Sequence, residues 1–149
     1  DSMLALQSNR PIVLRSPGAT RPWQHVLEPL WGYLLLGIRL WESPKEFSGA
    51  WNFGPSAGSW KTVENLVKIL IQSWGKGEYR VDSDTTPLHE ARMLMLNTDK
   101  AQLMLPWQPR WDIQQTIVET VGWYRNVHEG TQALETTHSQ IMRYTGEII

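Results

Sequence analysis

Residues 27–42, with the sequence LEPLWGYLLLGIRLWE, hold the clearest structural signal in the chain. Apolar side chains recur there at helical spacing and predict one long helix with an apolar face, made of Leu27, Leu30, Trp31, Leu34, Leu35, Ile38 and Trp41. Pro29 falls in the first turn, where a missing amide hydrogen costs little, and Ser43-Pro44 ends the helix. We expect this face to lie in a core.

Outward from this helix, short β-prone runs alternate with further helices. One helix is predicted from Val63 to Trp74 after a cap at Thr62, and Asp112 with Gln115 forms a capping box for another. Shorter helices are expected within residues 1–10, 98–105 and 140–144, and strands within 12–14, 21–26, 50–53, 79–81 and 93–96. The alternation predicts a helix-rich α/β fold with a small, mostly parallel sheet of short strands.

The composition excludes several classes of protein. The chain has 149 residues, of which 14 are basic and 15 acidic, and no cysteine. Its length suits one domain, and its near-neutral charge argues against a nucleic-acid binder. Without cysteine there are no disulfides, zinc–thiolate sites or thiol nucleophiles. No apolar run approaches the ~20 residues of a membrane helix, and no signal peptide is visible, so we expect a cytoplasmic protein without a membrane partner.

Nine tryptophans stand against two phenylalanines. Tryptophan combines a large apolar ring with one polar group, so it serves cores, ligand pockets and interfaces alike. Trp31, Trp41 and Trp74 lie on the apolar faces of predicted helices, and we expect them in the core. Trp23, Trp51, Trp107 and Trp111 lie at segment ends or in a predicted strand, where an indole can pack and donate.

A candidate catalytic motif lies at Gly54-Pro55-Ser56-Ala57-Gly58. It fits G-x-S-x-G, the strand–turn–helix elbow that exposes the nucleophilic serine of some hydrolases. Helical periodicity begins only near Val63, however, and Pro55 would have to occupy the strained turn. A plain Gly/Pro turn is the stronger interpretation, and a small serine hydrolase using Ser56 stays as an alternative.

Neither a metal nor a dinucleotide cofactor is indicated by the spacing of residues. The four histidines, His25, His89, His128 and His138, show no pair with metal-ligand spacing. Gly75-Lys76-Gly77 ends a predicted helix, whereas a dinucleotide fingerprint needs glycines after a strand and before a helix. No tyrosine is followed by lysine in a Tyr-x-x-x-Lys pair. We therefore expect no cofactor in this chain.

Arg15 and Arg21 flank a loop between two predicted extended segments. The guanidinium group offers a planar fork of donors that matches phosphate oxygens bidentately. An anion site is one interpretation, and two solvated arginines are the other.

The stretch Arg21-Pro22-Trp23-Gln24-His25-Val26-Leu27-Glu28-Pro29-Leu30 closely resembles CDP-glucose 4,6-dehydratases of the extended short-chain dehydrogenase/reductase superfamily. Further matching motifs follow in order: Gly32-Tyr33-Leu34, Gly49-Ala50-Trp51-Asn52-Phe53-Gly54-Pro55, Thr62-Val63-Glu64, His89-Glu90-Ala91, Trp107-Gln108-Pro109-Arg110-Trp111 and Trp123-Tyr124. The resemblance covers nearly the whole chain, and its first stretch is the most specific.

The resemblance implies a fold and an activity. Enzymes of this family are NAD-dependent lyases that act on a nucleotide-diphosphate sugar, with an N-terminal Rossmann domain and a C-terminal substrate domain. Residues 1–149 resemble the C-terminal substrate domain alone, so we expect the NAD-binding domain to be absent from this chain. The reaction needs a nicotinamide and acid/base groups, and we expect no catalysis from these residues by themselves.

The resemblance also implies substrate-binding residues. Arg21 matches the arginine that holds the substrate pyrophosphate, and Glu90, beside His89, matches an acidic residue that accepts hydrogen bonds from the ribose. Leu14 and Arg15 fall in the strand that lines the base pocket. We expect these residues to bind a nucleotide-diphosphate sugar, with CDP-glucose as one candidate.

An alternative function follows from the same resemblance. A substrate domain without its partner domain exposes an apolar surface, and such surfaces usually find partners. The chain is then a structural or interaction protein, and we expect a homo-oligomer.

Overall fold

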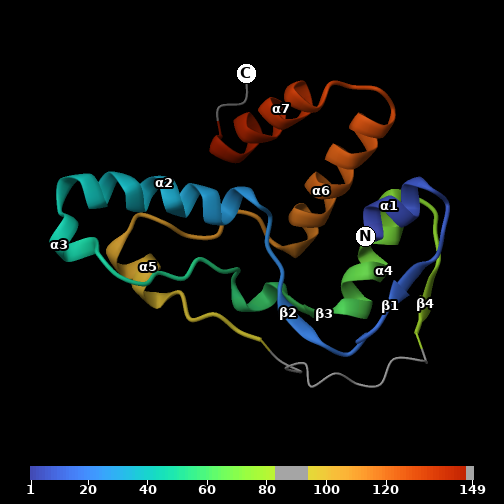
Figure 1. Cartoon of the computed structure of the whole chain (residues 1–149), viewed down its shortest axis with the longest axis horizontal. Coiled ribbons are helices and arrows are strands. Elements are labelled where there is room, and N and C mark those ends of the chain that lie inside the picture. Colours follow the sequence, from blue (N-terminus) through green and yellow to red (C-terminus); the bar gives the residue numbers. More distant parts are fainter. Residues whose placement is uncertain (83–93, 147–149) are drawn as a thin grey trace.

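A computed structural model describes residues 1–82 and 94–146 of the chain. Helices dominate these residues, and the strands are short (Figure 1). The helices are α1 (Ser2–Gln7), α2 (Leu27–Glu42), α3 (Pro44–Phe47), α4 (Val63–Trp74), α5 (Asp99–Met104), α6 (Ile113–His128) and α7 (Ala133–Thr145), with a 3-10 turn at Ala57–Ser59. The strands are β1 (Ile12–Leu14), β2 (Thr20–Pro22), β3 (Trp60–Thr62) and β4 (Tyr79–Val81).

The strands of the described residues form two separate pairs. β1 and β4 are parallel, with Ile12 opposite Tyr79. β2 and β3 are antiparallel, with Arg21 opposite Lys61. The expectation of one mostly parallel sheet was therefore wrong, although the helix-rich α/β class is confirmed. The strands predicted at residues 50–53 and 94–96 are irregular instead, because no described strand lies beside them to complete a ladder.

The first core lies between α1, α4, α6 and strand β1. Its buried members are aliphatic or methionine: Met3, Leu6, Ile12, Leu14, Val67, Leu70, Ile113, Ile117 and Val121. Predicted caps define two of its helices, since Thr62 Oγ1 accepts from the amide of Asn65 at 3.1 Å and Asp112 Oδ1 accepts from that of Gln115 at 2.8 Å. Gly75 ends α4 in the left-handed conformation, with φ +93°.

The second core lies under α2 and is mostly aromatic. Its buried members are Phe47, Phe53, Ala101, Leu105 and Trp107. α2 turns toward it with residues that only partly match the predicted face, since Trp31 and Leu35 were predicted and the others were not: Trp31, Gly32, Leu35, Leu36 and Leu40. The prediction that Trp41 lies in the core was wrong, because this residue is 90% exposed. α2 is apolar on nearly all sides, so periodicity alone could not select the side that packs.

A buried carboxylate joins the two cores. Glu28, in the first turn of α2, is fully buried. Its carboxylate accepts hydrogen bonds from the amides of Arg110 at 3.1 Å and Trp111 at 2.8 Å, and from the hydroxyl of Tyr144 at 2.7 Å. Its carbonyl accepts from the indole of Trp107 at 3.1 Å. Glu28 therefore ties α2 to α7 and to the segment that leads into α6.

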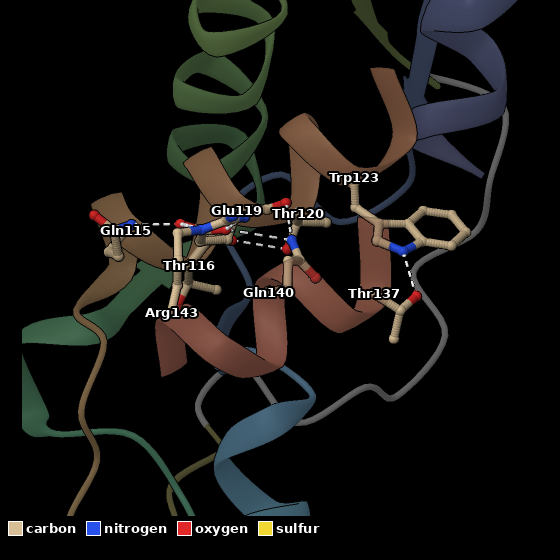
Figure 2. A network of polar contacts seen from close by, with 8 residues as sticks. All are labelled: Gln115, Thr116, Glu119, Thr120, Trp123, Thr137, Gln140 and Arg143. Carbon is tan, nitrogen blue, oxygen red and sulfur yellow. Dashed lines mark hydrogen bonds and ion pairs between the residues drawn. The ribbon is translucent and has the colours of Figure 1, made fainter. Parts of the chain in front are cut away.

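α7 is held to α6 by polar side chains (Figure 2). The carboxylate of Glu119, on α6, accepts from Gln115 at 2.8 Å and pairs with Arg143 of α7 at 2.7 Å. Gln140 of α7 donates to the Glu119 carbonyl. Buried charges need such partners, so this network fixes the angle at which α7 returns toward the N-terminus of α2.

The described residues offer neither a membrane helix nor a metal cluster. None of the described helices is both long enough and apolar enough to span a bilayer. In residues 1–82 and 94–146, histidine, aspartate and glutamate nowhere gather in threes that could hold a metal ion.

Candidate functional site

The antiparallel ribbon of β2 and β3 carries Arg21, the residue predicted to hold a pyrophosphate. Arg21 is half-buried, and its Nη1 donates to the carbonyl of Thr20 at 2.9 Å. Directly opposite in the register is Lys61, also half-buried. The indole of Trp23 donates to the Lys61 carbonyl at 2.9 Å, which locks the two strands together beyond the ladder.

Two cationic side chains thus share one face of the ribbon. Residues directly opposite in an antiparallel pair have Cβ atoms about 4.5–5.5 Å apart, and like charges in that position are destabilising. An anion bound between them would turn this repulsion into two charge-assisted contacts, which are the strongest hydrogen bonds that proteins make. The register of the ribbon thus brings together two cationic side chains, the residue type that anionic ligands contact.

Glu64, the next acidic residue after Lys61, is bound to residues outside the ribbon. Glu64 Oε1 accepts from the hydroxyl of Tyr79 at 2.7 Å and pairs with Lys68 at 2.8 Å. These hydrogen bonds, from Lys68 first and Tyr79 second, lower the pKa of Glu64. The Glu64 carboxylate therefore stays ionised on its own partners.

The connection from β1 to β2 is fixed to the start of α4. The amide of Val63 donates to the Ala19 carbonyl at 3.0 Å, and the amide of Glu64 donates to the Pro17 carbonyl at 3.0 Å. Arg15 is exposed at the beginning of this connection. The structure thus places Arg15 and Arg21 at opposite ends of one anchored loop, as the sequence indicated.

Leu14 lies at the end of β1, with its side chain in the first core at 3% exposure. Its carbonyl accepts from the amide of Asp82 at 2.8 Å. Leu14 therefore offers little accessible surface to a ligand. The role of Leu14 in base binding stays a prediction.

Glu90 and His89 lie outside the described residues. The residues that flank the undescribed segment are both attached to the strands of the site. Asp82 is bound to Leu14, as above, and the amide of Leu94 donates to the carbonyl of Thr20 at 3.4 Å. The chain therefore leaves beside β1 and returns beside β2.

Ser56 does not occupy a nucleophile elbow. It is exposed, and its backbone is extended, with φ −60° and ψ 157°. A 3-10 turn and strand β3 follow it, and the long helix begins only at Val63. The geometry is that of an ordinary turn, without the strand-to-helix arrangement that a hydrolase serine needs.

The described turns do not fit a dinucleotide. β3 runs directly into α4, and the junction is closed by the side chain of Thr62 and not by glycines. Gly75 and Gly77 both have positive φ, but they follow α4. A pyrophosphate cradle requires the reverse order, with glycines before the helix.

Sequence reasoning missed the place of Lys61 opposite Arg21 and the burial of Glu28. Lys61 acquires its place from strand pairing across 40 positions, and no local pattern marks such a partner. Glu28 carried a weak signal, because it is an acid within an otherwise apolar stretch next to a proline. Buried acids are rare unless hydrogen-bonded.

Comparison with known proteins supports the resemblance. No family model matches the chain. It is 37% identical over 145 residues to CDP-glucose 4,6-dehydratase from Salmonella typhimurium, an alignment that covers 97% of this chain and 40% of that protein. The solved structure of dTDP-glucose 4,6-dehydratase from Bacillus anthracis in complex with NAD superimposes with a TM-score of 0.65 and 21% identity, over 87% of this chain and 39% of that one. This chain therefore spans about two fifths of the length of each, and it has the fold of part of an extended short-chain dehydrogenase/reductase.

Proposed function

We propose that this chain binds a nucleotide-diphosphate sugar, with Arg21 and Lys61 holding the pyrophosphate. The observation that carries the proposal is the direct opposition of these two cations on the β2–β3 ribbon. The similarity to part of CDP-glucose 4,6-dehydratase supplies the class of ligand. Arg15, at the other end of the anchored loop, is a second cation within the same connection.

The ribose and base are proposed to be bound by residues beside this ribbon. Glu90 and His89 belong to the segment whose flanks, Asp82 and Leu94, are bound to Leu14 and Thr20. A carboxylate accepts hydrogen bonds from two vicinal hydroxyl groups, which is the pattern that a ribose offers. The base would lie toward the end of β1.

We further propose that these residues bind the sugar nucleotide without converting it. Dehydration through oxidation at C4 needs a bound nicotinamide and acid/base groups. The sequence has neither a glycine fingerprint before a helix nor a Tyr-x-x-x-Lys pair. Incubation of the chain with CDP-glucose and NAD should therefore leave the substrate intact by NMR.

Isothermal titration calorimetry with CDP-glucose, CDP and UDP-glucose tests the binding. We expect Arg21→Ala and Lys61→Ala each to weaken binding about 10- to 100-fold, the cost of a charge-assisted hydrogen bond. Arg80→Ala is the matched control, since Arg80 is an exposed cation on strand β4, and it should bind like the unchanged chain. No heat with any of the three ligands at millimolar concentration would sink the proposal.

A second readout separates an anion site from a structural role. If Lys61 repels Arg21 in the absence of ligand, Lys61→Ala should raise the free energy of unfolding by a few tenths of a kcal/mol while it weakens binding. A lysine that merely stabilised the ribbon would instead lower the free energy of unfolding when removed.

A further inference from the structure

A shallow groove lies between α2 and the segment that joins α5 to α6, which runs beneath α2 (Figure 1). Its volume is about 410 Å³. Clefts that hold small molecules usually measure about 300–1,000 Å³, so the groove has the size for a small ligand. Its walls come from α2, from α5 and from residues 105–110, none of which belongs to the β2–β3 ribbon. The groove is therefore separate from the site proposed for the pyrophosphate.

The groove carries one positive charge, on Arg110. None of the other described residues that line it is charged, and Arg110 is exposed. Its guanidinium group lies over two aromatic rings, with the central carbon atom 5.1 Å from the ring centre of Trp31 and 5.2 Å from that of Tyr144. Its Nη1 donates to the Tyr144 carbonyl at 2.7 Å. These contacts hold the group in one orientation before a ligand arrives, which lowers the entropic cost of binding.

The guanidinium group of Arg110 is not used by the buried acid beside it. Glu28 accepts hydrogen bonds from the amides of Arg110 and Trp111 and from the hydroxyl of Tyr144, which are three donors outside the guanidinium group. Within residues 1–82 and 94–146, Nε and Nη2 of Arg110 have no hydrogen-bond partner. These two nitrogens form one edge of the guanidinium fork, and such an edge matches the two oxygens of a carboxylate.

The remaining walls of the groove are apolar rings and an amide. The Trp31 ring and Pro109 are half-buried, and Pro106 is exposed. Rigid rings of this kind favour a flat apolar body, since neither side loses much freedom on contact. Gln108 is also exposed, and its side chain forms no hydrogen bond within the described part of the chain. An apolar lining with a few polar groups is typical of small-molecule sites.

We propose that this groove binds a small carboxylic acid with an aromatic body, whose carboxylate is held by Nε and Nη2 of Arg110. The ring of the ligand packs against Trp31 and the two prolines. A single guanidinium fork satisfies both oxygens of a carboxylate. An anion without an apolar body would leave the apolar walls in water and lose the contribution of their burial.

Benzoate is the probe, because it joins a carboxylate to a flat ring. With about nine non-hydrogen atoms it should bind with a dissociation constant in the millimolar range, and NMR should show shifts of the Trp31 indole and the Arg110 amide. Benzamide has the same shape without the charge, and acetate has the charge without the ring, so each should bind at least about tenfold more weakly. Equal binding of benzoate and benzamide, or no shift at these two residues with tens of millimolar benzoate, overturns the proposal.

Glutamate variants test the place of the ligand with little change to the fold. Gln108→Glu adds a negative charge to the groove and should weaken benzoate binding about 3- to 10-fold. The matched control is Gln114→Glu, because Gln114 is an exposed glutamine on α6 that does not line the groove. This control should bind benzoate like the unchanged chain, and equal effects of the two variants would contradict the proposal.

Two further variants separate the fork of Arg110 from its charge and from the ribbon. Arg110→Lys keeps the charge but removes the planar fork, so it should weaken benzoate binding at least about tenfold, with circular dichroism to show that the chain is folded. Arg21→Ala should leave benzoate binding unchanged, so this proposal and the one for the pyrophosphate can fail separately. Displacement of benzoate by CDP-glucose would assign the carboxylate to the ribbon and overturn the inference.

Discussion

The first core and the second core differ in how completely they are enclosed. The first is aliphatic and is surrounded by α1, α4, α6 and the β1–β4 pair. The second is aromatic, with Phe47, Phe53 and Trp107 as its large members, and its outer wall is α2. The elements around the first core expose a few apolar side chains, such as Leu4, Val13 and Val118, whereas α2 alone exposes five: Leu30, Tyr33, Leu34, Ile38 and Trp41.

The comparison shows what each region needs. A closed aliphatic core obtains its stability from area removed from water within the chain itself. The second core is covered by α2, which is apolar on both sides. This chain therefore removes only part of the apolar surface of α2 from water. The second region is thus the less completely enclosed of the two.

The largest effect is expected where the two regions meet. Glu28→Ala leaves the amides of Arg110 and Trp111 and the hydroxyl of Tyr144 without their acceptor. Each unsatisfied buried donor costs about 1–3 kcal/mol, so we expect a loss of about 4 kcal/mol in the free energy of unfolding. Urea denaturation measures it. Glu42→Ala, an exposed acid on the same helix, should change it by less than about 0.5 kcal/mol.

The next prediction compares the loss of stability when a buried side chain is truncated in each of the two cores. Ile117→Ala in the first core should cost about 3 kcal/mol of unfolding free energy, because the closed surroundings keep the cavity. Leu105→Ala in the second core should cost about 2 kcal/mol, because the open side can relax. Both residues are 3% exposed, so equal losses in urea denaturation would contradict the distinction between closed and open cores.

The pH dependence of stability should report on the region where the two cores meet. Burial lowers the pKa of His25, with a smaller opposing contribution from Glu119. Its Nδ1 accepts from the amide of Leu27 at 3.3 Å, and its ring contacts Trp111 edge-on. Because the folded state favours neutral imidazole, stability should be full above the unfolded pKa of about 6.5 and fall as the pH drops toward the folded pKa. Thermal denaturation from pH 7.5 to 5 should show this, and His25→Asn should flatten the profile.

At alkaline pH, Tyr144 should make stability depend on pH, because its pKa is shifted in the direction opposite to that of His25. Burial, followed by the hydrogen bond to Glu28, raises the pKa of Tyr144. The folded state therefore favours the neutral phenol, and stability should decrease as the pH rises above the unfolded value of about 10. Tyr144→Phe should remove this decrease in a denaturation series from pH 8 to 11. An unchanged alkaline profile would contradict the assignment.

The smallest effect is expected on the exposed apolar face of α2. Leu34→Lys should change the free energy of unfolding of this chain by less than about 0.5 kcal/mol, because Leu34 is 63% exposed. A loss of 2 kcal/mol or more in urea denaturation would mean that the chain itself covers this residue.

Local sequence signals predicted much of the fold. α4 and α6 are capped by Thr62 and Asp112 as expected, because an N-cap side chain binds an amide only three residues away. α1, α5 and α7 lie within or around the stretches predicted for them. Arg21 was predicted for a phosphate contact, and that role stays a prediction.

Structural features that depend on residues far apart in the sequence could not be predicted from local patterns. Residues 50–53 have the composition of a strand but find no strand partner within the described residues. The side of α2 that packs could not be selected, since a helix that is apolar all round has no preferred side. Lys61 and Arg21 come together only because β2 pairs with β3.

The sequence by itself determined the positions of the long helices α2, α4 and α6, the caps of α4 and α6, and the resemblance to sugar-nucleotide dehydratases, since all of these depend on neighbours in the chain. The tertiary structure alone decided that Glu28 is a buried junction, that Lys61 stands opposite Arg21, and that one face of α2 is left open. These features arise from contacts across 40 to 116 positions. Closing such contacts is a matter of packing and loop entropy, which no local pattern encodes.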